Sequence, residues 1–386
     1  MIENCFKTEF IRQHTTNKAR ILRVTTPHGT FTTPTFMPVG TRAVVNFLLP
    51  EQLQQTGSQI ILGGNTYHML VQPGMEVIQN AGGMHAFMNW QQPMLTDSGG
   101  YQVLSLSQNK QICKIKEDGA HFKHPTSGEV LHLTPQSSIA AQKIIGADII
   151  MAFDQCTPDS TDPSVTAEAM ERSHRWLLIS KETHTKNPCS VYGAKQAFFA
   201  IVQGGYNRDL RLQCLEQVLS VEPDGIAIGG EIIGYDMEKT CEILQWLHPY
   251  LPQDQVHYTM GVGLEPQNLL DAVAQGADVF DCVAPTRNAR HGALYCGRIV
   301  IENNWPRFEA IEERTRILIK RSIYAKDVGP IMPECDCYTC QHFGRDYLHF
   351  LFKSNSNAFM NLACIHNVRV MQRTCEAMQQ CILAEK

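Results

Sequence analysis

Two features are missing from this sequence, and each absence excludes a class of protein. The chain has no apolar run of about 18 residues, the length that a helix needs to cross a bilayer, so we expect no membrane association. Residues 1–13 contain no apolar stretch of the kind that a secretory signal requires. The 14 cysteines are therefore expected to be reduced thiols, and we expect a cytoplasmic protein.

Other absences narrow the fold. No G-x-G-x-x-G motif opens a helix after the first apolar run, which argues against an open, doubly wound dinucleotide-binding sheet. The chain also has no low-complexity tract and no short-period repeat. With 386 residues, 43% of them hydrophobic, it can bury a large core as one barrel-sized domain with an insertion or as two domains.

What does recur is a short apolar run followed by a segment long enough for a helix. Continuous apolar runs of this length are typical of parallel strands that helices cover on both faces. Segments 48–57, 134–147 and 265–277 carry the start signals and periodicity of such helices. The eight runs occupy residues 35–40, 59–65, 93–100, 148–154, 197–205, 225–230, 256–263 and 277–285.

Eight such units predict an α/β fold, the closed (β/α)8 TIM barrel. In this fold the carboxyl ends of the strands meet at one mouth, where catalysis occurs. We expect four regions along the chain. Residues 1–33 form a small N-terminal β cap, which we expect to be a hairpin, and residues 34–291 form the barrel. A zinc-binding subdomain inserted after strand eight occupies 292–366, and a C-terminal helix occupies 367–386.

The inserted region contains a cluster of candidate metal ligands. Cys335, Cys337 and Cys340 form a C-x-C-x-x-C motif, and His366 follows farther along the chain. Three thiolates and one imidazole match the ligands of a closed tetrahedral zinc site, although cysteines can also cluster by chance. Because four protein ligands leave no position for an activated water, we expect one structural Zn²⁺.

Polar residues at the strand ends are the candidates for chemistry. Two carboxylates there could act as nucleophile and general acid/base in a displacement at an acetal-like carbon. Asp97 could instead cap a turn, and Asp154 could cap the helix after strand four. Asp281 is harder to explain structurally, since a charge directly after an apolar strand is costly unless it is used. The expected mouth residues are Asn65, Asp97, Asp154, Gln203, Gly229, Gly230, Met260 and Asp281.

Several of these residues lie in longer motifs that resemble the tRNA-guanine transglycosylase (queuine tRNA-ribosyltransferase) family, in its bacterial form. The resemblance extends from about residue 5 to the C-terminus. It implies a pentosyltransferase that replaces the wobble guanine of tRNA with a free 7-deazaguanine base in queuosine biosynthesis. It also implies a homodimer. The motifs are DSGGYQ (97–102), FDQCTP (153–158), IVQGG (201–205), YTMGVG (258–263), FDCVAPTRNARHG (280–292) and CDCYTC (335–340) with His366.

The resemblance also implies roles for individual residues. Asp281 matches the nucleophile that attacks ribose C1′ and forms a covalent enzyme–RNA intermediate. Asp97 matches the general acid/base for the leaving and incoming bases. A covalent ester also makes physical sense, because it preserves bond energy while one glycosidic bond replaces another. Two inversions at C1′ then give retention.

Further matches concern the base. Asp154 and Gln203 match the groups that read the guanine edge, with the Gly230 N–H as a donor to O6. Tyr101 and Met260 match a pair that sandwiches the flat ring. On spacing alone, Met260 would be an ordinary core residue. Ser98, Asn65 and His68 fit as supporting polar groups.

Recognition of the RNA is expected just past the nucleophile. Arg287 and Arg290 match positions near the flipped-out nucleotide. Eight basic residues lie between 287 and 321 against four glutamates, and such a segment could follow phosphates or be a solvated helix face. The formal charge of −5 argues against binding nucleic acid over the whole surface.

The chain departs from the family pattern after Gly230. An acid expected at Tyr235 is absent, and an acid occurs instead at Glu231. Glu231 could pair with the ammonium of 7-aminomethyl-7-deazaguanine, our default base, or the pocket could be remodelled for queuine. The charges of segment 307–331 also depart from the family pattern.

Three other functions share some of these features. A retaining glycosidase would also use two carboxylates, but it would not need a zinc clamp and usually carries more aromatic platforms than four tryptophans supply. A non-catalytic accessory subunit would lack Asp97 and Asp281, which are both present. An archaeal relative that modifies another tRNA position would carry a large C-terminal RNA-binding extension, which we do not expect because the sequence ends at Lys386.

Overall fold

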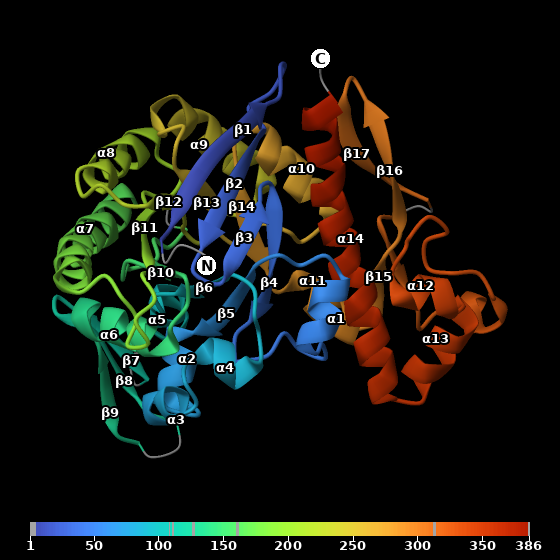
Figure 1. Cartoon of the computed structure of the whole chain (residues 1–386), viewed down its shortest axis with the longest axis horizontal. Coiled ribbons are helices and arrows are strands. Elements are labelled where there is room, and N and C mark those ends of the chain that lie inside the picture. Colours follow the sequence, from blue (N-terminus) through green and yellow to red (C-terminus); the bar gives the residue numbers. More distant parts are fainter. Residues whose placement is uncertain are drawn as a thin grey trace.

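The computed structural model describes residues 5–107, 109, 112–125, 128–159, 162–311 and 314–384 (Figure 1). Residues 1–4 of the expected cap and residues 385–386 of the expected C-terminal helix lie outside this description, as do Glu312 and Glu313 of the charged 307–331 segment.

A closed barrel of eight parallel strands forms the centre of the molecule. Strand β14 closes it by pairing with β4, with Val279 opposite Thr35 and Cys282 opposite Pro38. Each of the eight apolar runs supplies one strand, so the predicted (β/α)8 barrel is confirmed. The strands are β4 (Thr35–Gly40), β5 (Ile61–Asn65), β6 (Met94–Asp97), β10 (Ile149–Met151), β11 (Ala197–Val202), β12 (Gly225–Ile228), β13 (Val256–Thr259) and β14 (Val279–Cys282).

The apolar runs are continuous because both faces of each strand are buried. Every residue of β11 is buried. Phe199 and Ile201 contribute to the core inside the barrel, whereas Phe198 and Val202 pack in the layer between the barrel and its helices. A strand with one face in water would have alternated between apolar and polar residues.

Helices surround the barrel, and local signals set where they begin. Proline occupies the first turn of α1, α6, α7 and α10, where its missing N–H costs no hydrogen bond. Asp162, Asn207 and Asp236 cap α7, α8 and α9 through their side chains. The three helices expected from sequence are α1 (Pro50–Gln55), α6 (Pro135–Ile145) and α10 (Pro266–Ala274). Further helices between barrel strands include α2 (Thr66–Val71), α3 (Met75–Asn80), α4 (Met84–Met88), α7 (Pro163–Lys186), α8 (Arg208–Leu219) and α9 (Met237–Leu247), with the short 3₁₀ helix η1 (His248–Tyr250).

The N-terminal cap is a three-stranded antiparallel sheet rather than the expected hairpin. It comprises β1 (Lys7–Gln13), β2 (Arg20–Thr26) and β3 (Gly29–Thr32). Leu22, Val24 and Phe31 join the core inside the barrel, so the cap closes the amino-terminal end. Strand β1 is mostly exposed and polar, which is why the apolar pattern did not reveal it.

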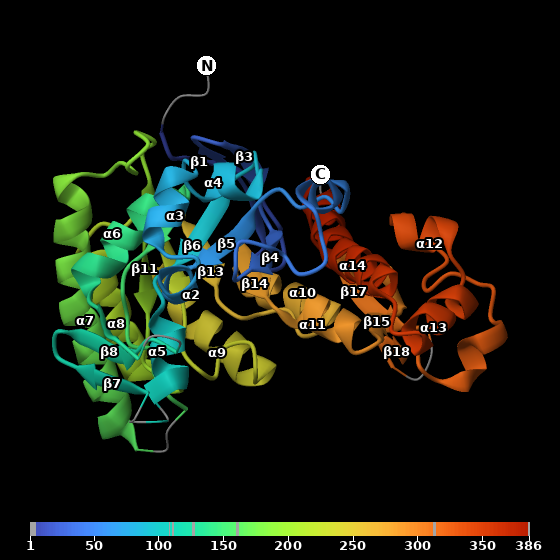
Figure 2. The ribbon, with the colours of Figure 1, turned by 90° about the horizontal axis from the view of Figure 1, so that it is seen from below.

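A second antiparallel sheet follows β6 and was not predicted. The short helix α5 (Gly100–Ser107) leads into β7 (Cys113–Lys116), β8 (Gly119–Lys123) and β9 (Val130–Leu133). Figure 2 shows β7 and β8 beside α5, at the end of the barrel opposite β1 and β3. Strands this short leave only a weak alternating pattern in the sequence.

The segment after β14 departs from the barrel before returning to it. It contains α11 (Ala284–Arg290), the pair β15 (Ala293–Tyr295) and β18 (Arg316–Leu318), the hairpin of β16 (Gly297–Glu302) and β17 (Trp305–Ala310), the 3₁₀ helix η2 (Ser322–Lys326), α12 (Tyr338–His342) and α13 (Arg345–Lys353). The long helix α14 (Asn357–Ala384) then packs against α10, α11 and β4, in the position of the eighth barrel helix. The boundary that we expected between residues 366 and 367 lies inside this one helix.

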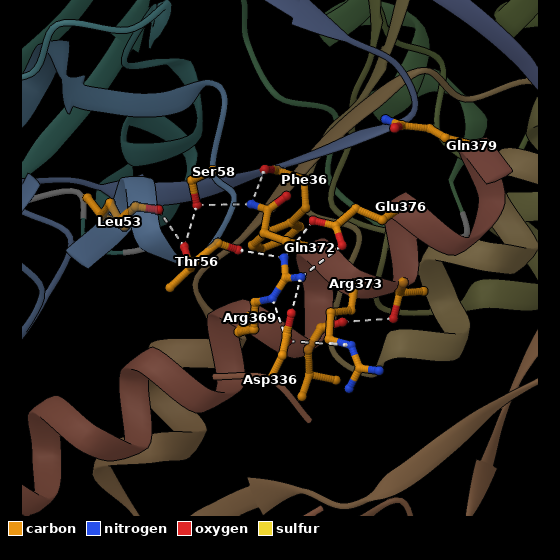
Figure 3. Close-up of polar contacts among 12 residues, drawn as sticks. Phe36, Leu53, Thr56, Ser58, Asp336, Arg369, Gln372, Arg373, Glu376 and Gln379 are labelled. Atoms are coloured by element: carbon orange, nitrogen blue, oxygen red, sulfur yellow. Dashed lines mark hydrogen bonds and ion pairs between the residues drawn. The ribbon is translucent and has the colours of Figure 1, made fainter. Parts of the chain in front are cut away.

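Helix α14 joins the candidate metal ligands to the barrel (Figure 3). The Arg369 guanidinium donates to the carboxylates of Asp336 and Glu376 and to the carbonyl of Thr56. Asp336 lies between Cys335 and Cys337 in the sequence, and Gln372, one turn farther along, donates to the carbonyl of Phe36 in β4. The cysteine loop and the barrel wall are thus held by the same two turns of helix.

Within the described residues, no helix combines the length and the apolarity that crossing a membrane would take.

Candidate active site and metal centre

A cavity of about 240 Å³ opens at the carboxyl ends of the barrel strands. The structure brings almost all of the expected mouth residues to this one cavity. Arg290, His68 and Gly229 are not among its lining residues. The sequence-derived candidates in its wall are Asn65, Asp97, Ser98, Tyr101, Asp154, Gln203, Gly230, Glu231, Met260, Asp281 and Arg287.

Asp281 occupies the end of β14 and is held by two donors. The Tyr258 hydroxyl donates to its Oδ1 at 2.6 Å, and the Gly261 N–H donates to the same oxygen at 3.1 Å. Burial raises the pKa of Asp281, and these two hydrogen bonds oppose that rise because they favour the ionised carboxylate. One carboxylate oxygen is therefore fixed, and the group is aimed at the cavity.

Asp97 ends β6 in a different environment. Asn65 Nδ2 donates to its Oδ2, and the N–H groups of Thr66 and Gly99 donate to its Oδ1 at 3.2 and 3.1 Å. Burial, with a smaller contribution from the Asp281 charge, raises the pKa of Asp97 to about 7 against the effect of these hydrogen bonds. The turn-capping bond to Gly99 is thus present as well, but it does not account for a carboxyl group that titrates near neutrality in a cavity.

Asp154 follows β10 and forms the polar floor of the cavity. The Ser98 hydroxyl donates to its Oδ1 at 3.0 Å, and Gln203 Nε2 donates to its Oδ2 at 2.7 Å. The Thr157 N–H donates to Gln203 Oε1, which fixes the orientation of the amide. Burial raises the pKa of Asp154 to about 6. The N-cap of α7 is Asp162, so Asp154 does not have the capping role that its position in the sequence allowed.

Behind Gly230 lies a fully buried arginine that sequence reasoning missed. Arg211 donates to the carbonyls of Val202, Gly205 and Gly229 at 2.7–2.9 Å, which ties the ends of β11 and β12 together. Gly230 has a φ of +122°, and a Cβ there would lie 3.1 Å from an Arg211 nitrogen. A glycine therefore suits both the backbone and the packing at this position.

Glu231 and Tyr235, the two residues that depart from the family pattern, line one part of the cavity wall. Glu231 accepts a hydrogen bond from the Asp159 N–H through its Oε2 at 2.8 Å. Tyr101 and Tyr235 also line the wall, and they are 48% and 66% exposed. Burial, followed by the hydrogen bond with Tyr235, raises the pKa of Tyr101 to about 12. The two phenols thus meet at the rim, next to the Glu231 carboxylate.

Two further cavity residues were not singled out from the sequence. Tyr258 is fully buried inside β13, and it belongs to the core inside the barrel together with Leu62. Strand alternation places its side chain inward, but only the three-dimensional structure shows its contact with Asp281. Gln102 accepts from Asn65 Nδ2 at 2.6 Å and so helps to orient the amide that contacts Asp97.

The four candidate metal ligands are buried together. The sulfur atoms of Cys335, Cys337 and Cys340 lie 3.8, 3.5 and 3.3 Å from His366 Nδ1. His366 Nε2 lies 2.8 Å from the carbonyl of Tyr295, so Nε2 carries the proton and Nδ1 is left to bind a metal. The cluster can hold a metal ion, as expected from the motif.

The expected basic segment is neutralised in part. Arg298 and Arg307 pair with Glu309 across the hairpin of β16 and β17, and Arg316 pairs with Glu265. Arg287 remains exposed at the edge of the cavity. The number of basic residues between 287 and 321 therefore overstates the positive charge available to a ligand.

Comparison with known proteins decides between the interpretations of this site. The family model described as "Queuine tRNA-ribosyltransferase" matches residues 15–386. The chain belongs to this family. It is 43% identical over 374 residues to the queuine tRNA-ribosyltransferase of Pseudomonas aeruginosa, covering 96% of this chain and 93% of that protein. The protein of the same name from Acetivibrio thermocellus is 40% identical over 383 residues, with 99% and 95% covered.

Other members of the queuine tRNA-ribosyltransferase family show the same degree of similarity. The Herpetosiphon aurantiacus protein is 42% identical over 376 residues, covering 97% of this chain and 88% of its own. The protein is therefore an enzyme, a transferase, and the expected family membership is confirmed. This membership argues against the glycosidase that two carboxylates alone would have allowed.

Proposed function

We propose that this transferase exchanges the wobble guanine of tRNA for a free 7-deazaguanine through a covalent aspartyl-ribose intermediate, within queuosine biosynthesis. The observation that carries the proposal is the pair Asp281 and Asp97 in one cavity, with different surroundings. Asp281 is fixed by two donors and ready to attack, whereas Asp97 has a pKa of about 7 and can gain or lose a proton at neutral pH.

The reaction has two displacements at ribose C1′. In the first, a carboxylate oxygen of Asp281 bonds to C1′ while the glycosidic bond breaks, and protonated Asp97 gives its proton to the departing guanine. In the second, ionised Asp97 takes the N9 proton of the incoming base, whose nitrogen bonds to C1′ as the ester breaks. Both carboxyl groups return to their starting states, and the configuration at C1′ is retained.

The base pocket supports this chemistry by matching the donors and acceptors of a guanine edge. Asp154, ionised and held by Ser98 and Gln203, accepts from the N1–H and the amino group. The Gly230 N–H donates to O6. Tyr101 and Met260 stack on the two faces of the ring, because an aromatic face and a thioether both favour contact with a flat π-system.

The 7-substituent of the incoming base is proposed to face Glu231. A carboxylate in the cavity wall favours a base that carries a protonated aminomethyl group at C7. Our default is 7-aminomethyl-7-deazaguanine. Queuine remains the alternative, since its substituent contains the same methylene-ammonium unit.

The RNA is proposed to enter from the side of α11. Arg287 lines the cavity edge and is exposed, so it can contact phosphate or a base edge near the extruded nucleotide. Arg290, on the same helix, is placed for a neighbouring nucleotide.

We also propose that the ion in the cysteine–histidine cluster is zinc. Zinc–sulfur and zinc–nitrogen bonds of about 2.3 and 2.0 Å at the tetrahedral angle place sulfur about 3.5 Å from nitrogen. The three distances in the cluster, 3.3–3.8 Å, bracket that value. All four ligands are protein groups, so the ion would fold the subdomain rather than take part in the exchange.

A homodimer and a cytoplasmic location complete the proposal. Exposed aromatic side chains on α12 and α13, among them Tyr338, Tyr347 and Phe350, support the dimer because they offer an apolar surface for self-association. None of the cysteines that the structure describes is joined to another by a disulfide, which suits a reducing compartment. Measuring the mass in solution tests the dimer.

The base-exchange assay tests the function. Purified enzyme and tRNA carrying labelled guanine at the wobble position are incubated with each free base. Release of label with 7-aminomethyl-7-deazaguanine supports the default, and release with queuine alone overturns the default but not the exchange. Label retained with both bases, and with guanine itself, contradicts the proposed function.

The Glu231 assignment has its own matched test. Glu231→Gln keeps the size and the acceptor oxygen for Asp159 but removes the charge. It should raise KM for the aminomethyl base by about tenfold or more, the loss of one charge-assisted contact, while guanine exchange stays unchanged. Equal changes for guanine and the aminomethyl base would show that Glu231 does not face the substituent.

A further inference from the structure

The sheet of β7, β8 and β9 has a strongly basic outer face, which we call the lysine face. It comprises Lys114, Lys116, His121, Lys123 and His132. Register places these side chains together, because Lys114 pairs with His121 and His121 pairs with His132. The three lysines and His132 are exposed, and the two imidazole rings lie 4.1 Å apart.

The opposite face of the sheet is apolar and fixes which side points outward. Cys113, Ala120 and Phe122 are buried in a cluster with Val103 of α5 and Trp176 of α7. Because strand residues alternate, packing this face against the two helices leaves the lysine face in solvent. A hollow of about 210 Å³ lies on the sheet and includes all three lysines in its lining.

The two acids in the turn between β7 and β8 are paired with side chains other than the three lysines. Glu117, in the turn between β7 and β8, is paired with Arg172 and Arg175 of α7. Asp118 is engaged by His121 at 2.9 Å; this hydrogen bond, and to a smaller extent the Lys116 charge, lowers the pKa of Asp118. The hairpin of β16 and β17 differs, since its arginines are matched by its own glutamates.

The lysine face lies at the active end of the barrel. Helix α5 begins at the cavity, where Tyr101 and Gln102 line the wall, and leads directly into β7. Eight residues of helix span about 12 Å, so the sheet is within a few nucleotides of a base held in the cavity. In both views the sheet lies on one side of the molecule and α11, which carries Arg287, lies toward the other (Figures 1 and 2).

We propose that the lysine face binds backbone phosphates of the tRNA substrate, on the side of the cavity opposite α11. The inference rests on the proposed function, because it takes the RNA as the occupant. Charge complementarity favours that occupant: ammonium groups that displace the counterions of phosphates give binding that weakens steeply with salt. Contacts on both sides of the mouth would hold the strand while its wobble nucleotide is turned into the pocket.

The test compares two triple variants with the same loss of charge. Lys114→Gln/Lys116→Gln/Lys123→Gln removes the lysine face. Lys7→Gln/Lys186→Gln/Lys195→Gln removes three exposed lysines at the amino-terminal end of the barrel, on the cap strand β1, at the end of α7 and just before β11. The Kd for an isolated anticodon stem-loop RNA is measured as a function of salt concentration, together with kcat and KM for the free base.

The lysine-face variant should bind the RNA about tenfold or more weakly at moderate salt. The slope of log K against log salt should fall by about two, since each lost phosphate contact lowers it by about 0.7–0.9. Its KM for the free base and its kcat at saturating RNA should stay as in the wild type, and the control variant should keep the wild-type Kd and slope.

Each contrary result has a separate meaning. If the two variants have the same Kd and slope while the wild-type enzyme exchanges guanine, the lysine face does not bind RNA and the proposed function stands. A weaker Kd with an unchanged slope would also overturn the inference, because the loss would not come from phosphate contacts. If the wild-type enzyme neither binds the RNA nor exchanges guanine, the proposed function fails together with the inference.

Discussion

Replacing Tyr258 by phenylalanine removes the hydroxyl that donates to Asp281 at 2.6 Å and leaves the buried ring in place. This hydrogen bond favours the ionised carboxylate and so lowers the pKa of Asp281 against the effect of burial. A hydrogen bond to a charged group contributes about 1.5–3 kcal/mol, and one pKa unit corresponds to 1.36 kcal/mol. Tyr258→Phe should therefore raise the pKa of Asp281 by about one to two units.

The consequence is a change in the pH profile of guanine exchange. Attack requires ionised Asp281 and protonated Asp97, so a plot of kcat/KM against pH is bell-shaped. The ionisation of Asp281 sets the acidic limb, and the ionisation of Asp97 sets the basic limb. A higher pKa for Asp281 moves the acidic limb to higher pH, while the basic limb stays in place. The bell becomes narrower and its maximum falls.

The assay is label exchange between about pH 5 and pH 9, with Tyr192→Phe as the control. The Tyr192 hydroxyl donates to the carbonyl of Ile144, and Tyr192 is not among the cavity-lining residues, so its loss should leave both limbs unchanged. If Tyr258→Phe lowers the rate equally at every pH, or moves the acidic limb downward, the role assigned to this hydroxyl is wrong.

Three further predictions follow from the same geometry. Asp97→Asn should abolish exchange yet raise the free energy of unfolding at neutral pH, measured by thermal denaturation, by about 4 kcal/mol, because burial raises the pKa of Asp97 to about 7 and each pKa unit corresponds to about 1.36 kcal/mol. Ionisation of Asp97 lowers stability as pH rises from about 4 through about 7, so the gain should vanish at low pH. Arg287→Ala should raise KM for tRNA far more than KM for the free base. Equal effects on the two KM values would show that Arg287 does not contact the RNA. Cys337→Ala, or removal of the metal by a chelator, should melt the subdomain and abolish RNA binding, whereas Cys189→Ala should not; a metal-free protein that binds tRNA normally would contradict this.

The barrel was predictable because a strand that is buried on both faces appears in the sequence as a continuous apolar run. A strand such as β11 has no polar residue that would break its apolar run, and eight such runs imply one closed sheet. Topology then places Asp97, Asp154 and Asp281 at one mouth without any knowledge of their side-chain conformations.

The remaining features depend on contacts that no local pattern encodes. The pairing of Tyr258 with Asp281 joins two strands, and Arg211 reaches three carbonyls from a helix whose sequence gives no sign of it. Strand β1 of the cap was missed because it is mostly exposed, and the sheet of β7–β9 was missed because its strands are short. Helix α14 was divided at His366 because the metal motif, rather than the helix, suggested the boundary.

The central claim is that Asp281 becomes covalently bonded to the ribose. Enzyme incubated with tRNA and without a free base should give a protein–RNA adduct that survives a denaturing gel, and a free 7-deazaguanine added before denaturation should discharge it. The adduct should be absent with Asp281→Asn, which is close in size but lacks the nucleophilic oxygen charge. An adduct of undiminished amount in Asp281→Asn would contradict the account.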